Sequence, residues 1–158
     1  MNDHDDDAKD ELEFNLRYAQ RLCERTARLY RRIQTVSTFI SLIAGSSTVA
    51  ALSAQRPATA AWLLAVFALF GCINLAIRPA EKIAANEADV HKYAVLIAKT
   101  DALDTATLQQ MLKEAHCTDA PEIEPLRAVA YNDVAREIGE PEAVIALTPM
   151  QKLMRALA

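Results

Sequence analysis

Two apolar stretches decide the fold: TVSTFISLIAGSSTVAALSA at residues 35–54 and AAWLLAVFALFGCINLAI at residues 60–77. Each is close to the ~20 apolar residues that a helix needs to cross a hydrocarbon core of ~30 Å. Residues 34–77 contain one charge, Arg56, and the linking residues 55–59 contain the helix-stopping Pro57. The sequence therefore predicts two membrane-spanning helices, joined by a short loop into an antiparallel hairpin.

A soluble protein with a buried helical hairpin is the alternative, because the first stretch carries eight Ser and Thr hydroxyls. A run of this length with a single charge is longer than the apolar segments that the core of a small soluble domain normally buries. This favours a membrane hairpin over a soluble one. A cleaved signal peptide does not fit. The leading residues are acidic, and the apolar run begins too far into the chain.

The flanks of the hairpin indicate its orientation. Four arginines lie just before the first stretch, Arg78 and Lys82 follow the second, and the loop has Arg56 alone. Because loops rich in Lys and Arg stay in the cytoplasm, we expect both termini to be cytoplasmic and residues 55–59 to lie on the opposite side.

Charge is strongly segregated along the 158 residues, although the formal net charge is only −4. Residues 1–13 carry seven acids and one Lys, whereas residues 14–33 carry six Arg and one Glu. We expect residues 1–8 to be a disordered acidic leader. Residues 9–34 are predicted to form a basic amphipathic cytoplasmic helix that continues into the first span, because no Gly or Pro interrupts it.

Five arginines share one face of that predicted helix, within an arc of about 80° at 100° per residue. They are Arg17, Arg21, Arg25, Arg28 and Arg32. Such a face suits the anionic headgroups of the cytoplasmic leaflet of a lipid bilayer. A solvated face that only fixes topology is an equal alternative. No nucleic-acid partner is expected, since neither interleaved aromatic residues nor a known fold signature accompanies the arginines.

Each predicted span carries a stripe of small residues, and these are the candidate helix-packing or pore-lining positions. The stripes are Ser37, Ser41, Gly45 and Thr48 on the first span, and Ala61, Ala65, Ala68, Cys72 and Ala76 on the second. Small side chains let helices approach closely in a membrane, so the stripes are expected to face each other or a neighbouring subunit of a homo-oligomer. A pore lined by the hydroxyls is the alternative. Packing is favoured because such hydroxyls often bond their own backbone.

Asn74 is the sole amide side chain within either span, and we expect it to make an inter-helix hydrogen bond.

Residues 78–158 are predicted to form a helical cytoplasmic domain. Pro79 marks a kink or stop, after which a helix runs to about Lys99. Further helices are expected in LDTATLQQMLKEAH at residues 103–116, after Pro121, and from the Thr148-Pro149 cap onward. The predicted fold class is thus all-α. A Gly-rich phosphate loop, an H-E-x-x-H motif and a nucleophile elbow are all missing, and the three cysteines lack C-x-x-C spacing. We expect no enzyme, cofactor or metal site.

The order of parts resembles the bacterial SLATT-type two-span effector families. These have a basic N-terminal helix like LRYAQRLCERTARLYRRIQ at residues 16–34, then two spans and a helical tail. The segment PLRAVAYNDVAREIG at 125–139 is similar to tails of small two-span proteins from bacterial and prophage genomes. Such families are viewed as membrane effectors in phage defence. The resemblance, which covers roughly residues 12–140, implies a multi-pass protein of the bacterial inner membrane with residues 55–59 as a periplasmic loop.

What the resemblance implies for function is a pore-forming or membrane-gating oligomer. The chain differs from the full systems in showing no attached sensor or nucleotide-making domain. The expected trigger is a cytoplasmic protein or a small molecule bound by the tail, and the alternative is that there is no trigger. Two rival functions fit the same architecture. One is a prophage holin or superinfection-exclusion protein, and the other is a membrane anchor whose tail recruits a cytoplasmic partner without permeation.

Overall fold

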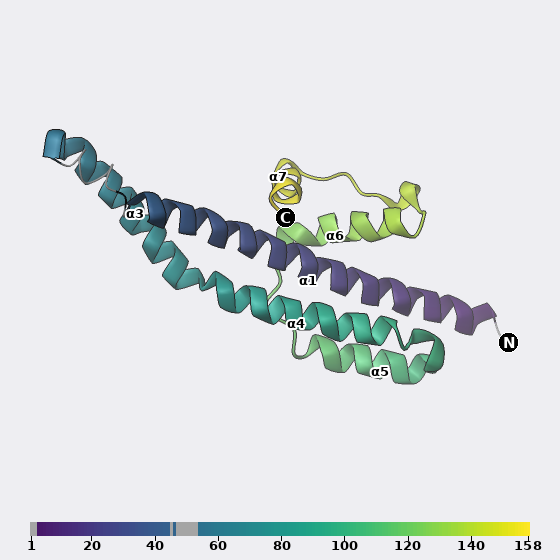
Figure 1. Ribbon diagram of the computed structural model, residues 1–158. Helices are drawn as coiled ribbons and strands as arrows, with labels where there is room; N and C mark the ends of the chain where they lie inside the picture. The colour runs from purple at the N-terminus through teal and green to yellow at the C-terminus, as the bar shows by residue number, and fades with distance from the viewer. Residues whose placement is uncertain (1–2, 45, 47–53) are drawn as a thin grey trace. The chain divides into compact units, whose positions relative to one another are not determined.

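A computed structural model describes residues 3–44, 46 and 54–158, and all regular structure in them is helical. This confirms the predicted all-α class. The α-helices are α1 (Asp3–Ala44), α3 (Pro57–Ile77), α4 (Pro79–Ile97), α5 (Thr105–His116), α6 (Glu124–Glu137) and α7 (Pro149–Leu157) (Figure 1). Short 3-10 turns occur at Thr100–Ala102 (η1) and Pro141–Ala143 (η2).

The chain divides into two compact units. The first, called here the polar unit, consists of Met1–Leu29 and Lys82–Ala158; the second, the apolar unit, is Tyr30–Glu81. Helices α1 and α4 each contribute residues to both units.

The first helix begins earlier than the sequence indicates. It starts at Asp3, so residues 3–8 of the segment predicted to be disordered are helical. Acidic residues near a helix N-terminus interact favourably with the positive end of the helix dipole, which explains why a strongly acidic segment extends α1. The helix then runs unbroken to Ala44, as expected from the lack of Gly and Pro in this range.

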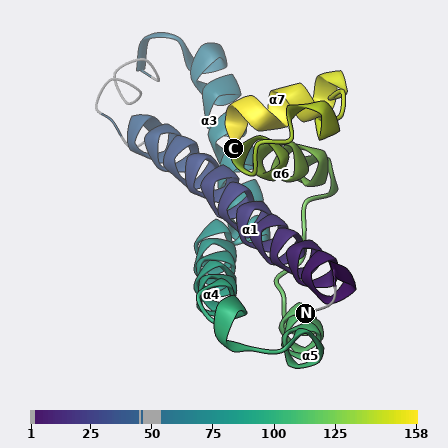
Figure 2. The same ribbon diagram turned by 90° about the vertical axis from the view of Figure 1, so that its right-hand side faces the viewer.

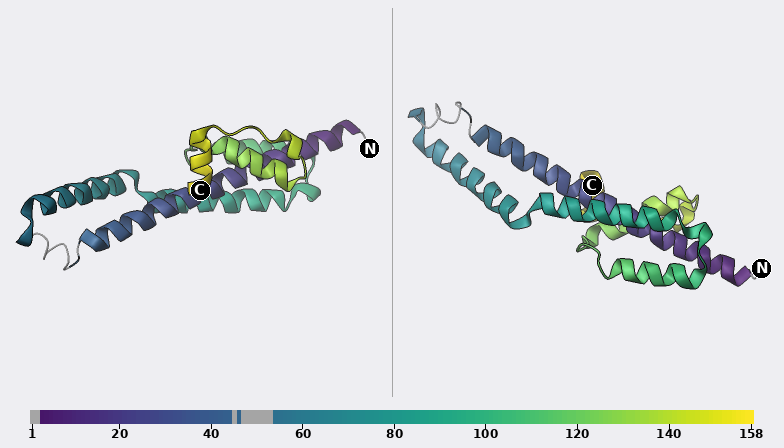
Figure 3. Two further views of the ribbon diagram at one scale, coloured as in Figure 1. Left: turned by 90° about the horizontal axis from the view of Figure 1, so that it is seen from above. Right: turned by 60° about the horizontal axis from the view of Figure 1, so that its bottom comes forward.

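The polar unit has a core in which α1, α4 and α5 meet; α4 and α5 lie side by side (Figures 1 and 3). The buried side chains are Leu12, Leu16, Ala19 and Cys23 from α1, Tyr93 and Leu96 from α4, and Leu108, Leu112 and Ala115 from α5. Their spacing of three or four residues places them on one face of each helix, so that burying this face removes a continuous apolar stripe from water.

Helix α6 supplies a second buried face, and α7 packs against it (Figure 2). The start of α7 is fixed by Pro149 and by a reciprocal capping box between Thr148 and Gln151. The loop between the two helices is held by Asn132 of α6. Its amide nitrogen donates to the backbone oxygen of Ile145 at 2.8 Å, and its Oδ1 accepts from the Ile145 nitrogen at 2.9 Å.

Asn132→Ala is expected to lower the free energy of unfolding of the polar unit by about 2 kcal/mol, because two hydrogen bonds are lost at a buried site. The Asn132 side chain is the partner of both backbone groups of Ile145, so amide exchange at residues 143–148 should also accelerate. Gln110→Ala, which removes a surface bond to Glu114, is the matched control. Equal unfolding free energies for the two variants would show that Asn132 does not hold the loop.

In the apolar unit, α3 begins at Pro57 and ends at Ile77, and its C-cap residue Arg78 adopts a left-handed conformation with φ 49°. The Arg78 N–H donates to the Asn74 carbonyl at 3.1 Å, and Pro79 then starts α4. Because a residue before proline is sterically barred from the α region, the helix cannot continue smoothly through this point. The expected stop at Pro79 is therefore confirmed.

One helical segment of the described chain, Ala58–Ile97, is long and apolar enough by length and composition to cross a membrane. Only 6% of its apolar window is buried. Part of the first predicted span, residues 45 and 47–53, lies outside the described residues.

Candidate functional site

Large apolar side chains cover the outside of the apolar unit. Trp62 is 76% exposed and Leu75 is 77% exposed. The other exposed members are Val36, Phe39, Leu42, Ile43, Leu64, Val66, Leu69 and Ile73. Soluble monomers rarely display contiguous apolar patches of this kind, because water is an unfavourable environment for them. The surface is typical of one that contacts lipid or another protein.

The small-residue stripe of α3 lies on this outer surface. Ala61, Ala65, Ala68, Cys72 and Ala76 are all exposed. The prediction that they face the first span inside the hairpin is therefore wrong; the alternative, that they face a neighbouring subunit, stays open. The more enclosed positions of α3 are Ala60, Leu63, Phe67, Phe70, Asn74 and Ile77. These residues are alternately three and four positions apart, so they lie along one side of α3. This is the inner side of the helix, where larger side chains fill the space beside α1.

The two described members of the hydroxyl stripe of α1 differ in burial: Ser37 is buried and Ser41 is exposed. Ser37 is only 5% exposed, and the Ser41 hydroxyl donates to the Ser37 carbonyl at 2.9 Å. Thr38 makes the same bond to Gln34, also at 2.9 Å. A hydroxyl engaged by its own helix is less free to hydrate a pore. The remaining predicted members, Gly45 and Thr48, lie outside the described residues.

Among the described residues, Asn74 shows no inter-helix hydrogen bond of the kind expected. Its Oδ1 is buried and has no hydrogen-bond partner within the described residues. The side chain lines a pocket of about 550 Å³ shared by Gln34 and Thr38 of α1 and by Gly71 and Arg78. An unpaired buried carbonyl oxygen costs free energy. A hydrogen-bond donor beside Asn74 Oδ1 would therefore stabilise the apolar unit.

Three of the five arginines predicted to meet lipid headgroups are instead paired within the protein. Arg17 and Arg21 both contact Glu137 of α6. Arg25 contacts Asp133 twice, through Nη2 at 2.6 Å and through Nε at 2.8 Å. Glu13 and Glu24 of α1 pair with Arg17 and Arg21 as well. The membrane-surface role predicted for these three arginines is therefore wrong, because carboxylates of α6 and of α1 itself occupy them. Arg28 and Arg32 occupy exposed positions.

A polar cluster centred on Lys92 joins α4 to the C-terminal end of α5. The Lys92 ammonium donates to Asp89 at 2.9 Å, to Asp119 at 2.6 Å and to the Ala115 carbonyl at 2.9 Å. The Tyr93 hydroxyl donates to the other oxygen of Asp119. These charge-assisted bonds fix the loop after α5 against α4.

Burial and the neighbouring carboxylates shift several pKa values here. Burial acts to lower the pKa of Lys92, but its hydrogen bonds to Asp119 and Asp89 outweigh this and raise it. Burial, and then the hydrogen bond to Asp119, raises the pKa of Tyr93. Burial, followed by the charges of Asp89 and Asp119, raises the pKa of the Cys23 thiol to about 12. All three shifts reinforce the protonation states that these groups already have at physiological pH, with Lys92 charged and Tyr93 and Cys23 neutral.

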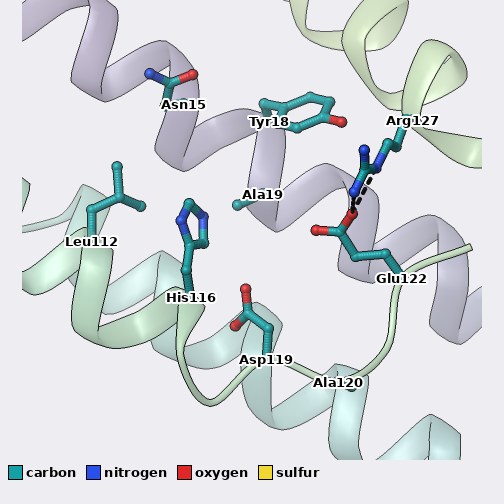
Figure 4. A pocket seen from close by; sticks show the side chains of 9 residues that line it. All are labelled: Asn15, Tyr18, Ala19, Leu112, His116, Asp119, Ala120, Glu122 and Arg127. Atoms are coloured by element: carbon teal, nitrogen blue, oxygen red, sulfur yellow. Dashed lines mark hydrogen bonds and ion pairs between the residues drawn. The ribbon is translucent and has the colours of Figure 1, made fainter. Parts of the chain in front are cut away.

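A pocket of about 590 Å³ opens beside this cluster (Figure 4). It is lined by Asn15, Tyr18, Ala19, Leu112, His116, Asp119, Ala120, Glu122 and Arg127. Figure 4 shows Arg127 paired with Glu122 at one side, a contact of 2.7 Å, with His116 and Asp119 projecting from the opposite side. The lining therefore combines an ion pair, an imidazole and a carboxylate around a small apolar floor of Ala19 and Leu112.

Fold and site together define an all-helical protein with one polar unit and one membrane-compatible apolar unit. No protein-family model, curated protein or solved structure matches the chain. Across the described residues, His, Cys, Asp and Glu side chains nowhere form a group of three that could hold a metal ion.

The Lys92 cluster and the pairing of α1 with α6 were both missed by the sequence interpretation. The sequence does contain a signal for the pairing of α1 with α6. Asp133 and Glu137 are four residues apart and share one face of α6, and Arg17, Arg21 and Arg25 share one face of α1 with the same spacing. Complementary faces with equal spacing predict helix pairing. No local pattern links Lys92 to Asp119, which lies 27 residues away.

Cys23 is expected to resist thiol reagents at pH 8, because its pKa moves from an ordinary 9.0 to about 12 and its side chain is buried. Exposed Cys117 should react at least tenfold faster in the same sample. Since the folded thiol has the raised pKa, its contribution to stability is complete below pH 9 and is lost as pH rises toward 12. Mass spectrometry after timed alkylation measures both rates. Equal rates would contradict the buried position of Cys23.

Proposed function

We propose that the chain is a two-span protein of the bacterial inner membrane that self-associates in the bilayer and perturbs or gates it. The observation that carries the proposal is the exposed apolar surface of the apolar unit. Lipid tails would cover these side chains, whereas water would leave them in an unfavourable environment. The basic flanks then keep both termini in the cytoplasm.

The outward stripe of α3 supports self-association. Ala61, Ala65, Ala68, Cys72 and Ala76 leave a shallow strip on the exposed side of α3. In a membrane, small residues at this spacing allow a helix of a second copy to approach closely, and van der Waals contact replaces the hydrophobic effect as the driving force. The stripe is the proposed contact between subunits.

The signal in this proposal enters through the polar unit. Helices α1 and α4 are each shared between the polar and the apolar unit. The polar unit is therefore linked to the first predicted span by the unbroken helix α1, and to the second by α4 across the break at Arg78 and Pro79. Gating would follow if a ligand or protein bound by the polar unit favours one of two arrangements of the spans.

The test is regulated expression in a bacterial host with a membrane-potential dye and a growth readout. Wild type is expected to depolarise cells. Ala65→Leu/Ala68→Leu places bulky side chains in the stripe, which keeps a second helix from approaching closely. The variant should therefore reduce both oligomer size and depolarisation at equal membrane abundance. Val66→Leu, on another face of α3, is the matched control and should behave as wild type. A wild-type protein that is abundant in the membrane yet never depolarises cells would remove the gating function.

A second candidate function, recruitment of a cytoplasmic partner to the membrane, is favoured by α7. Its residues Met150, Leu153 and Leu157 are exposed, at 55%, 54% and 41%, although α7 already packs on α6. An apolar helix face of this kind suits docking by a partner. Under this alternative, Leu153→Ser abolishes partner capture and leaves membrane potential unchanged.

A further inference from the structure

A second pocket, of about 440 Å³, lies between α6, α7 and the segment that joins them. Three cationic side chains line it: Arg136 from α6, and Lys152 and Arg155 from α7. The remainder of its lining consists of Asn132, Ile145, Leu147 and Ala156. No carboxylate is among the lining residues.

This pocket gathers positive charge within a part of the sequence that is acidic as a whole. Residues 101–158 contain ten acids and five bases, and three of those five bases line this pocket. Within the described chain, Lys152 and Arg155 have no carboxylate partner. Arg136 makes only a long ion pair, 3.9 Å, to Asp133, which is already engaged by Arg25 at 2.6 Å. The three cations are therefore largely unneutralised.

The walls of the pocket are held by interactions that do not use these cations. Asn132 fixes Ile145 through two hydrogen bonds, and the capping box of Thr148 and Gln151 sets the start of α7. Because the framework is complete without them, Arg136, Lys152 and Arg155 are available to a ligand without loss of structure.

We propose that this pocket binds a phosphate-bearing ligand with at least two negative charges. Arginine presents parallel N–H groups that match phosphate oxygens, and lysine adds a point charge. The volume lies within the range of roughly 300–1,000 Å³ that is usual for small-molecule sites. Ile145 and Leu147 offer apolar surface to an organic group attached to the phosphate. This binding property does not depend on whether the protein gates a membrane.

The test uses the full chain in nanodiscs of neutral lipid, titrated calorimetrically with pyrophosphate and with ATP. Wild type should bind saturably, and Lys152→Gln/Arg155→Gln should weaken the affinity at least tenfold. Lys113→Gln removes an exposed cation of α5 outside the pocket and should leave the affinity within twofold of wild type. Pyrophosphate should also raise the unfolding midpoint of wild type and not that of the double variant.

Absence of saturable binding by wild type, or equal affinity in the double variant, overturns the proposal. A second titration shows whether the natural ligand is a lipid headgroup or a soluble phosphate compound. In discs containing phosphatidylglycerol at 0.15 M salt, where the Debye length is about 8 Å, a weakened affinity for pyrophosphate assigns the pocket to lipid headgroups. An unchanged affinity assigns it to a soluble phosphate compound.

Discussion

Lys92→Met is expected to destabilise the polar unit by about 3 kcal/mol, the lower end of the cost of breaking a buried ion pair. The ammonium group bridges Asp89 and Asp119 and also holds the Ala115 carbonyl. Without it, two carboxylates with side chains only 10% and 13% exposed face each other with no cation between them. Methionine keeps much of the aliphatic volume, so the loss reports charge and hydrogen bonding rather than a cavity.

Amide hydrogen exchange on the detergent-solubilised chain is the measurement for Lys92→Met, because it resolves opening of α4 and α5 separately from the remainder of the protein. Protection should fall in both helices. Lys99→Met, at an exposed position, is the control and should change the opening free energy by about 0.5 kcal/mol or less. A loss below about 1 kcal/mol for Lys92→Met would show that the cluster adds little to stability.

Arg25→Glu is expected to cost about 3 kcal/mol and to release α6 from α1, because it replaces an ion pair by a repulsive contact. Both side chains of the Arg25–Asp133 pair are 17% exposed, so solvent screens the interaction only partly. The loss should appear as faster amide exchange throughout α6. The swapped pair, Arg25→Asp with Asp133→Arg, should recover part of the loss, which a double-mutant cycle measures as coupling.

Arg28→Glu is the matched control for Arg25→Glu, because it reverses the same charge at an exposed position of the same helix. Its expected effect is within about 0.5 kcal/mol. If Arg25→Glu and Arg28→Glu had the same effect, α1 and α6 would not be held together by this pair.

Local signals in the sequence were sufficient to predict the helices and several of the residues at which they begin or end. The lack of Gly and Pro predicted the continuity of α1, Pro79 predicted the break before α4, and the Thr148-Pro149 cap predicted the start of α7. Each of these features depends on the backbone preferences of a few neighbouring residues. The acidic leader is the exception: its low hydrophobicity predicts disorder, but its acidic residues interact favourably with the positive end of the helix dipole, and α1 starts at Asp3.

The orientation of α3 could not be derived in the same way. Apolar residues surround the whole helix, so hydrophobic periodicity does not indicate which face turns inward. The stripe of small residues from Ala61 to Ala76 indicated a close contact but not its partner, and the structure places the stripe outside. The pairing of Lys92 with Asp119 was equally hidden: the two residues are 27 apart in the sequence, and only packing of α4 against the end of α5 brings them together.

The central claim, that residues 35–77 form a membrane hairpin with its loop outside the cytoplasm, is tested most directly by cysteine accessibility. Ala58→Cys is introduced after Cys23, Cys72 and Cys117 have been replaced by Ser, and intact cells are treated with a membrane-impermeant thiol reagent. We expect labelling of Ala58→Cys in intact cells, whereas Asp101→Cys in the polar unit should be labelled only after lysis. Labelling of Ala58→Cys only after lysis, at equal abundance, would contradict the two-span topology.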